Sequence, residues 1–183
     1  ELAGIMYVSD NQARYPITKF IDSNINFEYT KDFFSRMSND LMPEISVRLS
    51  SDDYGWDKKS TIEAICRGIQ FDNLEKSFVE RLGETKLVVV DHISTTYLEA
   101  LAANVPVIIF CPLKAIDLND EAKEWFEKLK AEGIFHDSPA SAINWIRKVY
   151  FDIDKWWLKR SVQVTRIAFC DVYCKYPDSG IIS

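Results

Sequence analysis

Residues 88–110 read VVVDHISTTYLEALAANVPVIIF and place a polar turn between two apolar runs. The flanking runs, 86–91 and 105–111, are nearly continuous, as in strands that are covered on both faces of a parallel sheet. The residues between them, 94–103, are typical of a helix. This succession of strand, helix and strand predicts an α/β fold with a mostly parallel sheet flanked by helices.

The same pattern continues on both sides of this stretch. Alternation and short apolar runs predict further strands at 3–8, 44–50 and 65–70. Apolar residues at helical spacing predict helices at 30–42, 73–82, 120–133, 138–150 and 152–176, so that the chain is all-helical after residue 112. We expect one domain over 1–183, with an α/β core over 1–150 and a C-terminal helix over 151–176. Because the chain opens at Glu1 on an apolar run, we expect a fragment of a longer two-domain protein.

Composition excludes several classes of protein. Apolar residues make up 47% of the chain, which is enough for a sizeable core and argues against disorder. The formal charge of −6 gives no sign of nucleic-acid binding, which needs a basic stripe. No run of about 18 apolar residues and no signal peptide is present, so we expect no transmembrane helix. The four cysteines form no zinc pattern, so we expect no metal, and free thiols in a reducing cytoplasm.

The polar turn lies where open parallel sheets bind their ligands. Asp91 ends a strand, and ligands bind beyond the carboxyl ends of such strands. The next helix begins near Ser94, Thr95 and Thr96, where unpaired backbone N–H groups and a positive dipole end favour a phosphate. There is no glycine-rich loop, so the turn is not an ATP-binding loop. The alternative is that these hydroxyls only cap the helix.

Other side chains near the same sheet edge are candidates for a ligand site. Arg48 ends strand 44–50, and a guanidinium binds phosphate bidentately; the alternative is an ion pair with Asp52 or Asp53. Tyr54, in loop 51–57, is expected either to stack on a base or sugar or to cover the edge of the core, and the same alternatives hold for Trp56.

The two histidines have different surroundings. His92 follows Asp91 in the turn and is a candidate general base, or else it only lines the cleft. His136 precedes a helix, in the sequence GIFHDSP, and we expect it to be structural.

The stretch LEALAANVPVI, 98–108, resembles the donor-domain signature of GT-B-type glycosyltransferases, roughly L-E-A-M-A-x-G-x-P-V-I. The resemblance implies a Rossmann-like domain, half of a GT-B two-domain architecture. It implies that Glu99 holds the ribose hydroxyls of a nucleotide sugar, and that Asp91 lies near the sugar or its phosphate. Two positions depart from the pattern: Asp91 stands where the family usually has Glu, and Asn104 where it has Gly. Asparagine also tolerates a left-handed helix end, so the turn is expected to survive.

The chain is more closely similar to a group of bacterial surface-polysaccharide transferases, across roughly residues 45–175. The shared elements are a Tyr54-Gly55-Trp56 loop, the core from Ser94 to Pro106, and a terminal helix with Asp152 and Trp156-Trp157. This resemblance implies the C-terminal, donor-binding half of the enzyme, with an N-terminal acceptor half missing. It also implies that the last helix crosses back toward that half. The two tryptophans and Phe169 then pack across an interface, or alternatively the tryptophans are buried within this domain.

The sequence therefore leads to one function and two alternatives. The main expectation is the donor-binding domain of a glycosyltransferase of bacterial surface polysaccharide, with a nucleotide sugar as substrate and no cofactor. In this mechanism the start of the helix at Ser94, together with Arg48, stabilises the leaving nucleoside diphosphate. One alternative is a nucleotide-sugar epimerase or a polyol-phosphate transferase of the same fold. The other is a non-catalytic Rossmann-like binding module.

Overall fold

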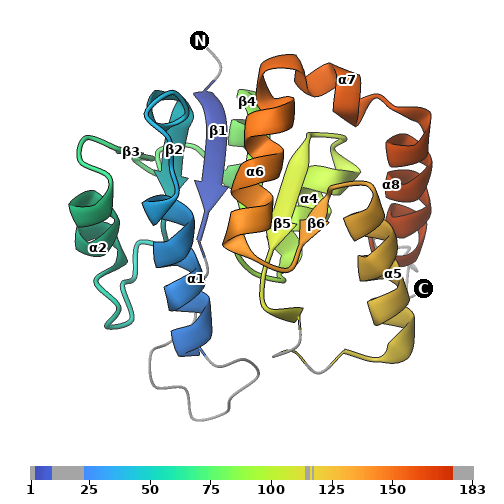
Figure 1. Ribbon diagram of the computed structural model, residues 1–183, viewed down its shortest axis with the longest axis horizontal. Coiled ribbons are helices and arrows are strands. Elements are labelled where there is room, and N and C mark those ends of the chain that lie inside the picture. The colour runs from blue at the N-terminus through green and yellow to red at the C-terminus, as the bar shows by residue number, and fades with distance from the viewer. Residues whose placement is uncertain (1–2, 10–22, 114–115, 117, 175–183) are drawn as a thin grey trace, which may run out of the picture.

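The computed structural model describes residues 3–9, 23–113, 116 and 118–174 of the chain. Its centre is a six-stranded sheet in which each strand pairs in parallel with its neighbours (Figure 1). The order 3-2-1-4-5-6 is that of a Rossmann-like fold, which confirms the predicted α/β class. In spatial order the strands are β3 (Gln70–Phe71), β2 (Ile45–Arg48), β1 (Ala3–Val8), β4 (Thr85–Val90), β5 (Val107–Phe110) and β6 (Phe135–His136).

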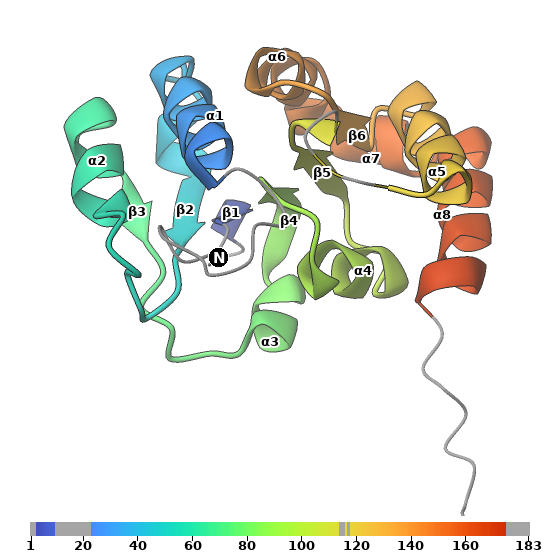
Figure 2. The same ribbon diagram turned by 90° about the horizontal axis from the view of Figure 1, so that it is seen from below.

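Helices cover both faces of this sheet, as Figure 2 shows from the side of the strands' carboxyl ends. One face carries α1 (Ser23–Ser35), α2 (Lys58–Ile65) and α6 (Pro139–Val149). The other face carries α3 (Phe78–Leu82) and α4 (Thr95–Ala102). Toward the β6 end lie α5 (Asp120–Ala131), α7 (Ile153–Trp157) and α8 (Arg160–Tyr173). Short 3-10 turns, Met42–Glu44 and Tyr150–Asp152, precede β2 and α7.

The core is built on the two central apolar strands. The side chains of Leu87–Val90 in β4 and of Val107–Phe110 in β5 are fully buried. This burial is the physical reason for the continuous apolar runs, because helices cover these strands from both sides. On the face of α1, Phe110 stacks on Phe33 with ring centroids 5.0 Å apart. This packing on both faces fixes where β4 ends, and so where the polar turn after it begins.

The elements around the quoted stretch lie where the sequence predicts them. Ser94 is the N-cap of α4, and Asn104 follows the helix with a left-handed φ of 55°. This conformation confirms that Asn104 replaces the glycine of the resembled pattern without losing the turn. The predicted strands 3–8 and 44–50 and the predicted helices 120–133 and 138–150 are also confirmed, within a few residues at each end.

The predicted strand 65–70 is wrong for most of its length. Ile65 is the last residue of α2, residues 66–69 form a turn, and only Gln70–Phe71 pair with β2. The error arises because Ile65, Cys66 and Ile69 form a short apolar run that fits a strand or a buried helix end equally well. The predicted helix 30–42 is also displaced, since α1 runs from Ser23 to Ser35.

The predicted helix 73–82 is reduced to its second half. Asp72 and Asn73 accept hydrogen bonds from the N–H groups of Leu74 and Glu75, and Leu74 has a φ of 61°. These side-chain contacts hold a loop instead of a helical turn. α3 then starts at Ser77, whose side chain forms a capping box with Glu80.

The C-terminal part contains a strand and a helix break that the sequence did not predict. β6 pairs with β5, so the chain is not all-helical after residue 112. The expected helix 152–176 is divided into α7 and α8, with the break at Leu158 and Lys159. Gln163 bridges the break by donating from Nε2 to the Trp157 carbonyl over 2.8 Å. Within the described residues the last helix ends at Tyr173.

Candidate functional site

The carboxyl edge of the sheet is hollowed where the strand order reverses, between β1 and β4. From this point the chain crosses over from β1 toward β2 and from β4 toward β5, which makes it the switch point where such sheets bind ligands. A pocket of about 450 Å³ lies here, and we call it the switch-point pocket. It is lined by Val8, Ser9, Arg48, Leu49, Ser50, Leu74, Phe78, His92, Ser94, Thr95 and Thr96.

A second cavity of about 370 Å³ adjoins the first and shares Leu49, Ser50 and Leu74 with it. We call it the loop pocket, because most of its wall is the 50–60 segment between β2 and α2. Its further lining residues are Val47, Ser51, Asp52, Asp53, Tyr54, Trp56, Asp57, Lys58, Lys59, Ser60, Phe71 and Asp72. The shared residues place the two pockets side by side.

Asp91 lies beneath the switch-point pocket, not in its wall. Its side chain is fully buried. Oδ2 accepts hydrogen bonds from the hydroxyls of Tyr7, Ser9 and Thr30, at 2.7, 3.0 and 2.9 Å. Burial alone would raise the pKa of Asp91, but the hydrogen bond and charge of His92 and the charge of Lys58 lower it to about 2. Asp91, which the resemblance implies lies near the sugar or its phosphate, thus has protein groups bonded to both of its carboxylate oxygens.

His92 connects this buried carboxylate to the pocket. Its Nδ1 lies 2.9 Å from Oδ1 of Asp91, and its imidazole lines the switch-point pocket with a side chain about 10% exposed. No hydrogen bond of Nε2 is found among the described residues. The sequence prediction that His92 faces the cleft is consistent with this position.

The start of α4 provides hydroxyls and backbone donors on the same pocket wall. Ser94 Oγ accepts from the Thr96 N–H at 3.3 Å and lies 3.2 Å from Thr96 Oγ1. The capping interpretation of Ser94 is therefore correct, and it leaves room for a ligand because Ser94, Thr95 and Thr96 all line the pocket. Thr95, the first helical residue, is exposed.

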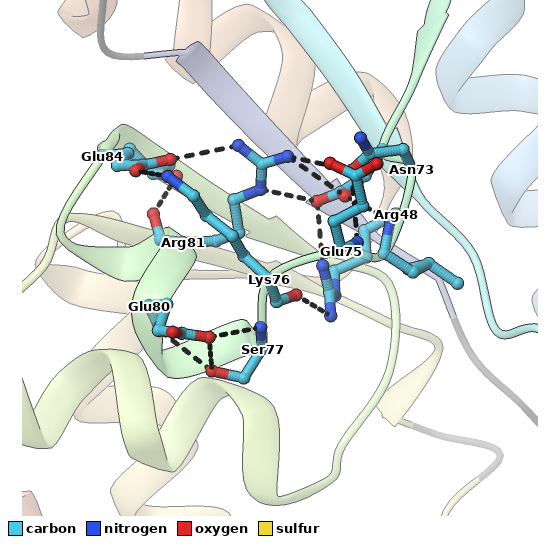
Figure 3. A network of polar contacts seen from close by, with 11 residues as sticks. Arg48, Asn73, Glu75, Lys76, Ser77, Glu80, Arg81 and Glu84 are labelled. Carbon is cyan, nitrogen blue, oxygen red and sulfur yellow. Dashed lines mark hydrogen bonds and ion pairs between the residues drawn. The ribbon is translucent and has the colours of Figure 1, made fainter.

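Arg48 lines the opposite wall and is held by an ion-pair network. Its Nη1 donates to Asp72 Oδ2 at 2.9 Å, and its Nη2 donates to the Lys76 carbonyl at 3.0 Å. Arg81 Nε lies 3.2 Å from the same Asp72 oxygen, and Glu84 binds Arg81 in turn (Figure 3). The expected alternative, a pair with Asp52 or Asp53, is wrong: the partner is Asp72.

Asp72 is shared by two guanidiniums, so the network keeps positive charge at the pocket. Burial alone would raise the pKa of Asp72, but the Leu74 N–H together with Arg48 and Arg81 lowers it. One carboxylate cannot neutralise both guanidiniums, and Glu84, which binds Arg81, also binds Lys76. Arg48 is therefore oriented by its partners while its charge remains available to an anion.

The aromatic residues of the loop pocket divide into one exposed and one buried ring. Tyr54 is 49% exposed and has a left-handed φ of 47°. Trp56 is only 7% exposed and packs on Phe27, with ring centroids 4.9 Å apart. Trp56 thus covers the edge of the core, and Tyr54 is the ring that remains open to a ligand.

Glu99 lies one turn into α4 and outside both pockets. It is three residues after Thr96 and four after Thr95, so the three residues share one face of the helix. Its side chain is partly exposed, and no hydrogen bond or ion pair to another described residue is found.

The two C-terminal tryptophans belong to this domain's own core. Trp156 and Trp157 are 4% and 2% exposed. Their indole N–H groups donate to the carbonyl of Glu132 and to Asn104, respectively. The alternative in which both are buried within the domain is correct, and the expectation that they pack against another domain is wrong.

Lys58 is a site residue that sequence reasoning missed. It is the first residue of α2, it is buried, and its Nζ donates to Ser9 Oγ at 3.1 Å. Ser9 in turn binds Asp91, so a cation from α2 reaches the network under the switch-point pocket. Lys58 and Ser9 are 49 positions apart, and such a contact leaves no local pattern in the sequence. The only available signal was the position of Lys58 shortly after the Tyr54–Trp56 loop.

Three general expectations concern metals, thiols and membranes. Among the described residues, no group of three or more histidines, cysteines or acids could hold a metal ion. The one Asp-x-Asp sequence, Asp152–Asp154, lies at the start of α7, away from the carboxyl edge. All four cysteines are free, and burial, with the charges of Asp91 and Asp137, raises the pKa of Cys111 to about 12. None of the described helices is long and apolar enough to cross a membrane.

The sequence was compared with models of protein families and with curated proteins. The family model described as LIC12162 family transferase matches residues 3–181, which is nearly the whole chain. No curated protein matches the chain.

Proposed function

This chain belongs to the LIC12162 family of transferases, and we propose that it binds the donor of the transferred group, a nucleotide sugar, at the carboxyl edge of its sheet. The observation that carries the proposal is the composition of the switch-point pocket. Arg48 at the end of β2 and the turn after β4, with His92 and the first residues of α4, are distant in the sequence and converge on one cavity at the switch point. In this proposal the protein is the donor-binding domain of a glycosyltransferase.

The phosphates of the donor occupy the switch-point pocket. The N-terminus of α4 offers the positive end of the helix dipole and backbone N–H groups that have no partner within the helix, of which Ser94 Oγ caps that of Thr96. Thr95 and Thr96 add hydroxyls, and Arg48 adds a pre-oriented guanidinium on the opposite wall. These donors stabilise a leaving diphosphate more strongly as its charge grows, which is how electrostatic catalysis lowers the barrier.

The uncharged part of the donor occupies the loop pocket. The exposed carboxylates of Asp52, Asp53 and Asp57 line this cavity and repel a phosphate, while they accept hydrogen bonds from hydroxyl groups. The open ring of Tyr54 provides an apolar face for a sugar or a base. The two pockets therefore divide the ligand by charge.

Glu99 contacts the ribose in this proposal, as the resemblance to GT-B-type enzymes implies. A nucleotide whose phosphate lies at Thr95 and Thr96 extends along the same face of α4 to Glu99, one turn away. Asp91 contributes indirectly by fixing His92.

The wider role follows from the same resemblance and is equally a proposal. The donor domain works with an acceptor domain in a GT-B-type protein, and the reaction serves bacterial surface-polysaccharide synthesis in the cytoplasm. A catalytic base for the acceptor then comes from that other domain.

A binding screen tests the proposal. The protein is titrated with UDP, GDP, CDP and CMP, each with and without a sugar, by thermal shift and calorimetry. Ligand at a hundred times its Kd stabilises the folded state by about 2.7 kcal/mol, so a specific nucleotide gives a clear rise in Tm. We expect Thr95→Val and Glu99→Gln to weaken this nucleotide, by about tenfold for each lost hydrogen bond.

The matched control is Glu124→Gln, an exposed carboxylate on α5 that lines neither pocket. It is expected to leave both Tm and affinity unchanged. Absence of binding at millimolar concentration of every nucleotide contradicts the proposal. Equal affinity of the wild type and both α4 variants places the nucleotide elsewhere.

A further inference from the structure

The pairing of Asp91 and His92 fixes which imidazole nitrogen carries a proton. Asp91 is ionised at neutral pH, because three hydroxyls donate to its carboxylate and its hydrogen-bond and charge partners hold its pKa below the usual value. A carboxylate only accepts hydrogen bonds, so His92 Nδ1, 2.9 Å away, is the donor. The neutral ring therefore presents the lone pair of Nε2, and only the charged ring presents an N–H there.

Several groups that donate hydrogen bonds line the switch-point pocket together with His92. The start of α4 offers backbone N–H groups and hydroxyls, and Arg48 offers guanidinium N–H groups. A bound phosphodiester oxygen only accepts, so it matches these donors but is repelled by a lone pair on Nε2. A phosphate in this pocket is fully satisfied only when Nε2 carries a proton.

The charges that face His92 from the neighbouring elements act in both directions. Asp91 beneath the ring favours the imidazolium. Lys58 from α2, through Ser9, and Arg48 from β2 across the pocket are positive and oppose a further positive charge. Tyr7 on β1 donates to Asp91, and burial raises the pKa of Cys111 after β5, so that this thiol stays neutral. A bound phosphate adds negative charge, and so tips this balance toward protonation.

We propose that His92 takes up a proton when a phosphate-bearing ligand enters the switch-point pocket, so that phosphate recognition is coupled to protonation of this one imidazole. The inference rests on the proposed function. It adds a residue that contacts the phosphate through Nε2–H, and it assigns Asp91, Tyr7, Ser9 and Thr30 the role of holding that residue in one tautomer.

Calorimetry with intact nucleotide sugars tests this coupling. UDP-, GDP- and CDP-linked hexoses are suitable probes, because their phosphodiesters do not titrate near neutral pH and any proton taken up belongs to the protein. The probe that binds is titrated at pH 8 in two buffers of different ionisation enthalpy. We expect proton uptake on binding at pH 8, and less uptake at lower pH, where more of the free protein already carries the proton. Affinity should fall by up to about tenfold per pH unit on the alkaline side.

Two variants separate His92 from other titrating groups. His92→Gln is expected to abolish the proton uptake and to make the affinity independent of pH. His136→Gln, at the other histidine, is expected to keep both. If His92→Gln does not fold, the nitrogen chemical shifts of His92 in the ligand-bound wild type report the charge of the ring directly.

The possible results are distinguishable. Binding without proton uptake, or with equal uptake in His92→Gln, overturns this inference and leaves the proposed function standing. A neutral His92 ring in the ligand-bound wild type does the same. Failure of every nucleotide sugar to bind overturns the proposed function, and this inference falls with it.

Discussion

Asp91 is a buried charge, and the groups around it offset the free energy lost when its carboxylate is removed from water. An ionised carboxylate placed in a core is strongly unfavourable unless it is paired and hydrogen-bonded. Three hydroxyls, from β1, its following residue and α1, together with His92, satisfy it. On the inner side of the polar turn, Asp91 is needed for this buried hydrogen-bond network. On the outer side, His92 and Ser94 line the switch-point pocket.

His136 differs from His92 because both of its ring nitrogens are used inside the protein. Nδ1 lies 2.8 Å from Ser141 Oγ, and Nε2 lies 3.1 Å from the Gly133 carbonyl. Burial lowers the pKa of His136 to about 4, although the Gly133 carbonyl opposes that shift. This geometry supports the sequence-based expectation that His136 is structural.

The lowered pKa of His136 predicts how stability depends on pH. Between about pH 6.5 and pH 4 the unfolded state binds a proton that the folded state does not, so stability is lost as the pH falls through this window. We expect a loss of up to about 3 kcal/mol from this residue. Urea denaturation at pH 7.5 and pH 4.5 measures the loss in free energy of unfolding.

His136→Gln provides the comparison, because it cannot take up the proton. The variant is less stable at pH 7.5, but its loss between pH 7.5 and pH 4.5 should be smaller by about 2–3 kcal/mol. Parallel pH profiles of the wild type and the variant would show that His136 has the same pKa in the folded and the unfolded state, and would contradict the prediction.

At the scale of elements, the accuracy of the sequence predictions follows burial. β4, α4 and β5 were predicted closely, because strands covered on both faces leave long apolar runs. The segment 58–82 was predicted poorly because its elements are short, and because Asp72 and Asn73 hold the loop through side-chain contacts. β6 has only two residues, and its pairing with β5 depends on tertiary contacts that no local pattern encodes.

The turn from α5 to β6 gives a test at this scale. Gly133 has a φ of 75°, and a Cβ there would lie 2.4 Å from the ring of Trp145. Gly68 has a φ of 83°, but a Cβ there would meet nothing within 4 Å. Gly68→Ala should therefore cost only the left-handed strain of about 1–2 kcal/mol, and Gly133→Ala about 1–3 kcal/mol more.

Chemical denaturation of both glycine variants, with equal m-values required, measures this difference in the free energy of unfolding. The pair separates backbone strain from steric overlap, because only the second differs between the sites. Equal costs would mean that the indole moves aside freely, and that Trp145 does not fix the α5–β6 turn.

For the whole molecule, the sequence was enough to predict the fold class, but not which residues come together in the candidate site. The sequence indicated that Arg48 and Ser94 lie at one edge of a parallel sheet, and the structure brings both to one pocket. It gave no sign that Asp72 orients Arg48, that Lys58 reaches Ser9, or that Asp91 lies beneath the pocket. These contacts join elements that become neighbours only when the whole chain has folded.

The same dependence on the whole fold applies to α8, which supports α4 from behind. Phe169 is 1% exposed and lies beside Tyr97 of α4, with ring centroids 6.3 Å apart, and Arg166 donates to the Leu101 carbonyl at 2.8 Å. Because these contacts join α8 to α4, we expect α8 to unfold together with the sheet. The start of α4 is the candidate phosphate site, so the shape of this site then depends on α8. Phe169→Ala should cost about 3–5 kcal/mol, while Ile167→Ala, half exposed on the same helix, should cost under about 1 kcal/mol.

Native-state hydrogen exchange decides whether α8 belongs to this cooperative unit. Slow amides of α8 and of β4 should exchange with the same free energy, and Phe169→Ala should lower both together. Loss of protection in α8 alone, with β4 unchanged, would show that the last helix opens independently. The position of α4, and with it the shape of the switch-point pocket, would then not depend on the C-terminal helix.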